Sequence, residues 1–112
     1  MGDLNYFIFL FKGEKMKKLK AYIIGSVKQA DEIKEYAKKI SNKYKVIDYV
    51  KPEKDKSFEE CVRHCFDNID VTNIVIAITK DDGSIGQGVT YELEYARRIR
   101  KEIMIINLHD KK

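Results

Sequence analysis

Proline and cysteine are scarce in this sequence, and it contains no long apolar run. One proline in 112 residues, with 44% apolar and 36% charged residues, excludes a proline-rich disordered chain and indicates a compact globular domain. The two cysteines, Cys61 and Cys65, are one helical turn apart, and a disulfide between them would strain a helix. Free thiols are typical of a reducing compartment, so we expect a cytoplasmic protein.

The longest apolar run, residues 6–11, is far shorter than the roughly 20 residues that a membrane-spanning helix needs. It also lacks the basic start and the small-residue cleavage site of a signal peptide, so we expect no membrane partner. A credible start at Met16 follows codons that resemble a ribosome-binding site. We therefore expect residues 1–15 to be a non-native or flexible extension that the fold does not need. Residues 16–112 would form one domain, and an added edge strand at residues 5–11 is the alternative.

A net charge of +4 favours an anionic ligand. The lysines are spread over helix faces and both ends of the chain, without an aromatic stripe between them, so we expect no nucleic-acid polymer as partner. Cys61, His64 and Cys65 are too few ligands for a structural zinc site, and two buried thiols beside a solvent-facing His64 are the favoured interpretation. We expect neither a metal nor a cofactor.

Short apolar runs alternate with amphipathic helical patterns along the chain. The runs at residues 19–25, 45–50, 73–79 and 102–108 predict strands. Apolar positions recurring every three or four residues predict the helices, the first with a stripe that reaches Tyr44, and Ser57 with Glu60 is typical of a capping box. The alternation predicts a single α/β domain, Rossmann-like or flavodoxin-like, with a mainly parallel sheet of about four to five strands flanked by helices. We expect the strand order 2-1-3-4, which brings the ends of the first and third strands together.

Three glycines, Gly83, Gly86 and Gly88, lie between the third strand and the next helical pattern. Glycines let a backbone approach a ligand closely, and a helix start offers unpaired N–H groups to an anion. If this helix begins near Val89, Glu92 falls among its inward-facing apolar positions, one turn from the start. A first-turn acid favoured by the helix dipole is one explanation of Glu92. Its place beside the glycine-rich loop favours a functional carboxylate instead.

Two motifs occur in order along the chain. Residues 22–28 read YIIGSVK, a strand followed by a G-S-[IV]-[RK] loop, and residues 84–96 read SIGQGVTYELEYA, similar to S-x-G-x-G-Y-E-L-G-x-A. Together they resemble the nucleoside 2-deoxyribosyltransferase superfamily, and in particular its 2'-deoxynucleoside 5'-monophosphate N-glycosidase branch. The resemblance covers roughly residues 19–107.

The resemblance implies an enzyme that cleaves or transfers the N-glycosidic bond of a (deoxy)nucleoside or its 5'-monophosphate. Glu92 would attack the anomeric carbon as nucleophile, and Asp82 would transfer a proton to the leaving base. Tyr22 would line the base. Sugar and phosphate would be held by Gly25, Ser26, Val27, Lys28, Ser84, Gly86 and Gly88. A homodimer or larger assembly is also implied, because the family completes its sites with residues of a partner subunit.

Three departures from the family pattern keep other functions open. Two extra residues between the glycines and Glu92 predict a bulge in the loop, and Glu94 replaces a usual glycine. The helix aspartate that orients the sugar falls on Cys65, and Asp67 lies about 200° further round the helix. One alternative is therefore a nucleotide-binding module of the same fold without catalysis. The other is a glutamate-dependent NAD-cleaving domain.

Overall fold

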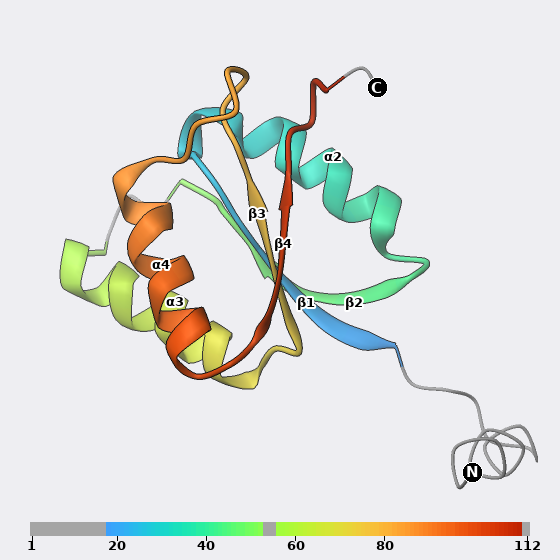
Figure 1. Cartoon of the computed structure of the whole chain (residues 1–112). Coiled ribbons are helices and arrows are strands. Elements are labelled where there is room, and N and C mark those ends of the chain that lie inside the picture. Colours follow the sequence, from blue (N-terminus) through green and yellow to red (C-terminus); the bar gives the residue numbers. More distant parts are fainter. Residues whose placement is uncertain (1–17, 53–55, 111–112) are drawn as a thin grey trace, which may run out of the picture.

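The computed structural model describes residues 18–52 and 56–110 as one four-stranded sheet flanked by helices (Figure 1). All neighbouring strands are parallel, and the order β2-β1-β3-β4 confirms the predicted one. The elements are β1 (Leu19–Ile24), the 3-10 helix η1 (Val27–Gln29), α2 (Ala30–Ile40), β2 (Tyr44–Tyr49), α3 (Phe58–Val71), β3 (Ile74–Ile78), α4 (Gln87–Arg98) and β4 (Glu102–Ile106). The expected extension at residues 1–15 and the alternative strand at residues 5–11 lie outside the described residues. Within those ranges no helix has the length and apolarity to cross a membrane.

The two predicted helix boundaries differ in outcome. α3 begins with the expected capping box: the Ser57 hydroxyl accepts the Glu60 N–H at 3.1 Å, and the Glu60 carboxylate accepts the Ser57 N–H at 2.9 Å. The prediction that the stripe of α2 reaches Tyr44 is wrong. The chain turns after Ile40, where the Lys43 N–H donates to the Ile40 carbonyl at 2.9 Å, and Tyr44 opens β2.

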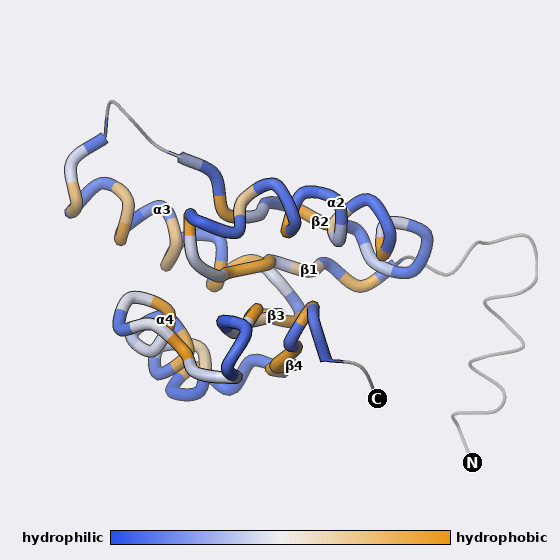
Figure 2. Tube along the Cα trace, turned by 90° about the horizontal axis from the view of Figure 1, so that it is seen from above, coloured by the Kyte–Doolittle hydropathy of each residue, from blue (hydrophilic) through white to orange (hydrophobic). Residues whose placement is uncertain are grey.

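The helices divide unequally between the two faces of the sheet. Figure 2 shows the strands stacked one above the other, with α3 and α4 to their left and α2 to their right. Side chains alternate across β1, so Ala21 and Ile23 pack with Ile33 of α2, whereas Tyr22 and Ile24 belong to the core under α3 and α4. The sheet therefore separates two apolar cores.

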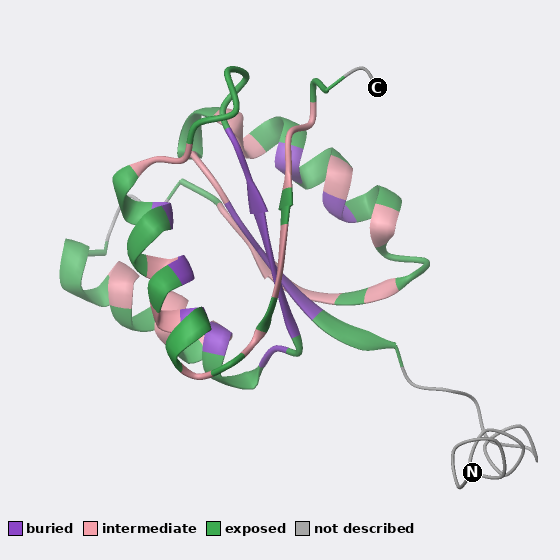
Figure 3. Cartoon of the chain, viewed as in Figure 1, coloured by how far each residue is buried: buried purple, intermediate pink, exposed green. Residues whose placement is uncertain are grey.

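β3 is the central support of the sheet. All five of its residues are buried, and Figure 3 shows the strand in the colour of buried residues along its length. Its continuous apolar run is typical of a parallel strand that is covered on both faces. Ile76 pairs with Ile23 of β1 on one side and with Met104 of β4 on the other. The carboxyl ends of β1 and β3 thus lie next to each other.

Gly25 makes the turn after β1 possible in this crowded place. A Cβ atom at Gly25 would lie 2.8 Å from Ile33 Cδ1 and 3.3 Å from Ile78 Cβ, closer than atoms normally approach. The missing side chain lets the backbone leave β1 in contact with both α2 and β3. It brings the loop after β1 alongside the loop after β3.

Replacing Gly25 by alanine is expected to lower the free energy of unfolding by about 1–3 kcal/mol, because the added methyl group overpacks this space. Gly88→Ala is the matched control, since no atom lies within 4 Å of a Cβ atom there. Gly88 lies inside α4, where alanine is expected to stabilise the helix by about 0.5–1 kcal/mol. Urea denaturation measures both changes, and unchanged stability of Gly25→Ala would contradict the packing argument.

Candidate functional site

Two cavities meet at Glu92 on the carboxyl edge of the sheet. The larger cavity, of about 520 Å³, is lined by residues of β1, the end of β2, α3 and α4. The smaller cavity, of about 290 Å³, lies between the loop after β1 and the loop that leads from β3 into α4. Gly25 and Glu92 line both. Because Gly25 has no side chain, Glu92 supplies the functional group at the junction.

Glu92 is a half-buried carboxylate in the second turn of α4. The helix begins at Gln87, with Gly86 as its N-cap, so Gly88 is helical and the predicted bulge before Glu92 is wrong. The first-turn explanation of Glu92 is wrong for the same reason, since the dipole effect falls off within the first turn. Burial dominates instead: it raises the pKa of Glu92, and a hydrogen bond with Cys65 partly opposes it.

Cys65 and Tyr22 connect Glu92 to the wall of the larger cavity. The Cys65 side chain lies close enough to both Glu92 and Tyr22 to influence the pKa of each, and Asn68 opposes the rise in the pKa of Tyr22. Burial raises the pKa of the Cys65 thiol to about 12, so this side chain is neutral at pH 7. Burial also raises the pKa of Tyr22, which is 4% exposed. Tyr22 therefore lines the cavity as a buried, neutral hydroxyl.

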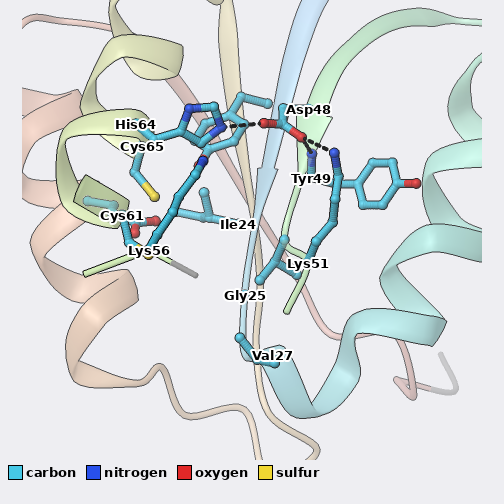
Figure 4. A pocket seen from close by; sticks show the side chains of 13 residues that line it. Ile24, Gly25, Val27, Asp48, Tyr49, Lys51, Lys56, Cys61, His64 and Cys65 are labelled. Atoms are coloured by element: carbon cyan, nitrogen blue, oxygen red, sulfur yellow. Dashed lines mark hydrogen bonds and ion pairs between the residues drawn. The ribbon is translucent and has the colours of Figure 1, made fainter. Parts of the chain in front are cut away.

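Asp48, near the end of β2, holds a second polar cluster. Its Oδ2 accepts hydrogen bonds from His64 Nε2 at 2.9 Å and Asn68 Nδ2 at 3.0 Å, and its Oδ1 lies 3.0 Å from Lys51 Nζ. Figure 4 shows Asp48 between His64 on one side and Lys51 on the other. Burial raises the pKa of Asp48, but hydrogen bonds from Lys51, His64 and the Tyr49 N–H outweigh it and leave the pKa below its usual value. Asp48 is thus an ionised anchor.

Sequence reasoning missed this cluster. It selected neither Asp48 nor Asn68, and it took His64 for a solvent-facing residue beside two buried thiols. His64 is exposed but bonded to Asp48, and the half-buried Cys61 and Cys65 line the larger cavity with it. The sequence did contain a sign of this cluster. His64 and Asn68 are one helical turn apart and so share a helix face, and Asp48 lies near the carboxyl end of a predicted strand, where ligands bind in parallel sheets.

Asp82 and Ser84 lie in a tight turn of their own. The Gly83 N–H donates to the Lys80 carbonyl at 2.8 Å, and Gly83 has a φ of 87° that favours glycine. Asp82 Oδ1 accepts from the Ser84 hydroxyl at 2.7 Å and from its N–H at 2.9 Å. These bonds lower the pKa of Asp82, which makes it a poor proton donor. Both side chains are exposed and line neither cavity, so the structure does not bring Asp82 to Glu92.

The other residues expected to bind sugar and phosphate are divided between the cavities. Val27 lines the larger cavity, whereas Ser26, Gly86 and Gly88 line the smaller one. Lys28 lines neither; its backbone N–H donates to the Ser26 hydroxyl at 3.2 Å and its side chain is exposed. The smaller cavity is instead lined by Lys80, a lysine that sequence reasoning did not select.

Comparison with known proteins supports the fold. No family model and no curated protein matches this sequence. Among solved structures, the CMP N-glycosidase BcmB of Clostridium botulinum matches with a TM-score of 0.54 and 17% identity, over 76% of this chain and 69% of that chain. At this identity the match shows a shared fold. It agrees with the predicted α/β architecture and its strand order 2-1-3-4.

Asp48→Asn is expected to lower the free energy of unfolding at pH 7 by about 1–3 kcal/mol, because its donors lose an ionised partner. The pKa of Asp48 is lowered in the folded state, so its contribution is present above the ordinary aspartate pKa and is lost as pH falls through the folded value. The difference from wild type should therefore shrink below about pH 4. Asp67→Asn, an exposed carboxylate of α3 outside both cavities, is the control. A pH-independent difference in urea denaturation would contradict the electrostatic origin.

Proposed function

We propose that this chain cleaves the N-glycosidic bond of a nucleoside 5'-monophosphate with Glu92 as the nucleophile. The observation that carries the proposal is the position of Glu92 where the two cavities meet. A nucleotide carries its base and its phosphate on opposite ends of the sugar. A carboxylate between two cavities is therefore suited to reach C1' while base and phosphate are bound on either side.

The smaller cavity has the chemistry of a phosphate site. Gly86, the N-cap of the twelve-residue helix α4, makes no side-chain cap, so N–H groups of the first turn remain for a ligand. Ser26 adds a hydroxyl and Lys80 adds a cation. Charge-assisted hydrogen bonds of this kind suit a doubly charged phosphate. The net charge of +4 also favours the approach of an anion.

The larger cavity suits the base and the sugar. Its volume of about 520 Å³ lies within the usual range for small-molecule sites, about 300–1,000 Å³. Ile24 and Val27 contribute apolar surface, and the Asp48 cluster contributes polar groups. Such a combination binds a flat heterocycle and also orients it.

The half-buried carboxylate of Glu92 provides the nucleophile of the proposed reaction. Burial raises the pKa of Glu92, which makes its ionised form more basic and a better nucleophile. Attack on C1' forms a glycosyl ester as the bond to the base breaks, and water then hydrolyses the ester, as in retaining glycosidases. Cys65, beside Glu92, partly opposes the rise in its pKa and so favours the ionised form that attacks. The activity named for the structure with the same fold, a CMP N-glycosidase, supports this reaction class.

A binding module without catalysis is the second candidate, and Cys65 favours it. A neutral thiol stands beside Glu92 where the resembled family has an aspartate, so the site lacks the negative charge that would orient the sugar. The NAD-cleaving alternative shares the buried glutamate. All three are separated by incubating the protein with ribonucleoside and deoxyribonucleoside 5'-monophosphates and NAD. Free base from a monophosphate supports our proposal, binding without release supports the module, and nicotinamide supports NAD cleavage.

Glu92→Gln is expected to reduce base release by several orders of magnitude, because an amide cannot attack C1'. Binding of the monophosphate should change much less. Attack requires the ionised form and burial raises the pKa of Glu92, so wild-type kcat/KM should fall with decreasing pH through a value above the ordinary glutamate pKa of about 4.3.

Glu94→Gln is the matched control for this variant. Glu94 lies two residues further along α4, is exposed and lines neither cavity, so its loss should leave base release unchanged. Chromatography of the free base measures both variants. Full activity of Glu92→Gln would disprove the nucleophile.

Lys80→Ala is expected to weaken binding of a 5'-monophosphate by about 1–3 kcal/mol relative to the nucleoside, through loss of a charge-assisted hydrogen bond. Lys28→Ala should have a smaller effect, because Lys28 lines neither cavity. Calorimetric titration of both variants with a monophosphate and its nucleoside separates the two lysines. If Lys28→Ala loses more affinity for the monophosphate than Lys80→Ala does, then Lys28, the residue indicated by the sequence motif, is the lysine that binds the phosphate.

A further inference from the structure

Cleavage of an N-glycosidic bond leaves the electron pair of that bond on the base. Most bases leave readily only when a proton reaches them in the same step, and a positioned acid supplies such a proton. Asp82, the acid expected from the sequence, lies in the exposed turn at residues 80–84 and lines neither cavity. The acid that protonates the leaving base is therefore to be sought among the other groups of the larger cavity.

We propose that His64, oriented by Asp48, donates the proton to the leaving base. This inference rests on the proposed function of Glu92. His64 projects from α3 and Asp48 from β2, and both line the cavity that Glu92 also lines. The base would lie in that cavity between the imidazole and the carboxylate of Glu92.

The contact with Asp48 determines which ring nitrogen exchanges the proton. His64 Nε2 lies 2.9 Å from Asp48 Oδ2, and Asn68 Nδ2 lies 3.0 Å from the same oxygen (Figure 4). Since the carboxylate of Asp48 accepts hydrogen bonds, Nε2 keeps its proton and points at Asp48. The close polar contacts that His64 makes within the described ranges all involve Nε2. Nδ1 is thus the atom that can give a proton and take it back.

Other proton-bearing groups of the cavity fit this role less well. Burial raises the pKa of Tyr22 and raises that of Cys65 to about 12, so both keep their protons at neutral pH. Asp48 is held ionised by its donors and has no proton to give. Lys51 is held by Asp48 at 3.0 Å. An imidazole also exchanges a proton near neutral pH more readily than an ammonium group or a thiol does.

The step balances with these groups alone. A carboxylate oxygen of Glu92 forms a bond to C1' while the bond from C1' to the base nitrogen breaks, and its electron pair goes to the base. The Nδ1 proton of His64 passes to the base, which leaves as a neutral molecule. The oxygen of water then forms a bond to C1' while the bond from C1' to the Glu92 oxygen breaks, its electron pair returns to the carboxylate, and one proton of the water passes to His64 Nδ1. Sugar phosphate is released, and Glu92 and His64 regain their starting states.

The test compares two substrates that share the sugar phosphate and carry leaving groups with different needs for an acid. One is cytidine 5'-monophosphate, or whichever monophosphate of the panel is cleaved fastest. The other is the 4-nitrophenyl glycoside of the same sugar 5-phosphate, whose leaving group departs as a stable anion without a proton. His64→Gln keeps an amide N–H near the position of Nε2, so the hydrogen bond to Asp48 is retained while proton donation is lost.

We expect His64→Gln to lower kcat/KM for the nucleotide by about 10²–10⁴-fold, the usual contribution of a general acid, and to leave kcat/KM for the nitrophenyl substrate near the wild-type value, because kcat/KM reports only the steps up to formation of the glycosyl ester. His109→Gln is the matched control. Its Nε2 also contacts a carboxylate, Glu32 at 2.7 Å, and its exposure of 47% matches the 46% of His64, but it lines neither cavity. That variant should keep both activities.

The outcomes separate this inference from the proposed function. Equal losses of kcat/KM on both substrates, or no loss on either, would overturn the role of His64, and melting temperatures identify a loss that comes from misfolding. In the misfolding case, His64→Asn is measured in the same way. Loss of both activities in Glu92→Gln supports the nucleophile independently of His64. If wild type cleaves neither substrate, the proposed function fails and this inference fails with it.

Discussion

The parallel pairing of β1 with β3 is the constraint on which the site depends. Ile24 lies opposite Ala77 near the carboxyl ends of the two strands, where both are buried, so the segments after β1 and β3 leave the sheet at the same edge. Gly25 permits this, because a side chain there would collide with Ile33 and Ile78. The two loops and the start of α4 consequently enclose one space. Glu92 lines this space because α4 packs its apolar stripe on the same sheet.

Two half-buried carboxylates, Asp48 and Glu92, lie at this edge, and they are stabilised unequally. Asp48 receives hydrogen bonds from His64, Asn68 and the Tyr49 N–H and an ion pair with Lys51, and its pKa falls despite burial. Burial raises the pKa of Glu92, and the neighbouring Cys65 opposes this effect only in part. Acidic groups whose pKa values are moved in opposite directions within one cavity are typical of active sites. The fold thus separates an anchoring carboxylate, Asp48, from the carboxylate that we propose as the nucleophile, Glu92.

The sequence predicted more of the fold than of the site. Alternating apolar runs and helical stripes were sufficient for the strand order, because parallel strands joined by helices have few possible arrangements. The capping box at Ser57 was equally readable, since it depends on contacts three residues apart. The helix start at Gln87 was missed. Glycine residues alone do not mark the start of a helix. Because α4 begins about half a turn earlier than predicted, Glu92 lies in its second turn, and burial, not the helix dipole, dominates its pKa.

By itself, the sequence determined the periodicity of each element, the glycine that the turn after β1 requires, Gly25, and the inward position of Glu92 on its helix. Each of these depends on neighbours a few residues apart. The tertiary structure alone decided that Asp48 meets His64 and that Asp82 stays in an exposed turn. Asp48 and His64 belong to different elements, and the way α3 packs against the sheet determines their distance. That packing results from the shapes of both cores together, and no local pattern of residues encodes it.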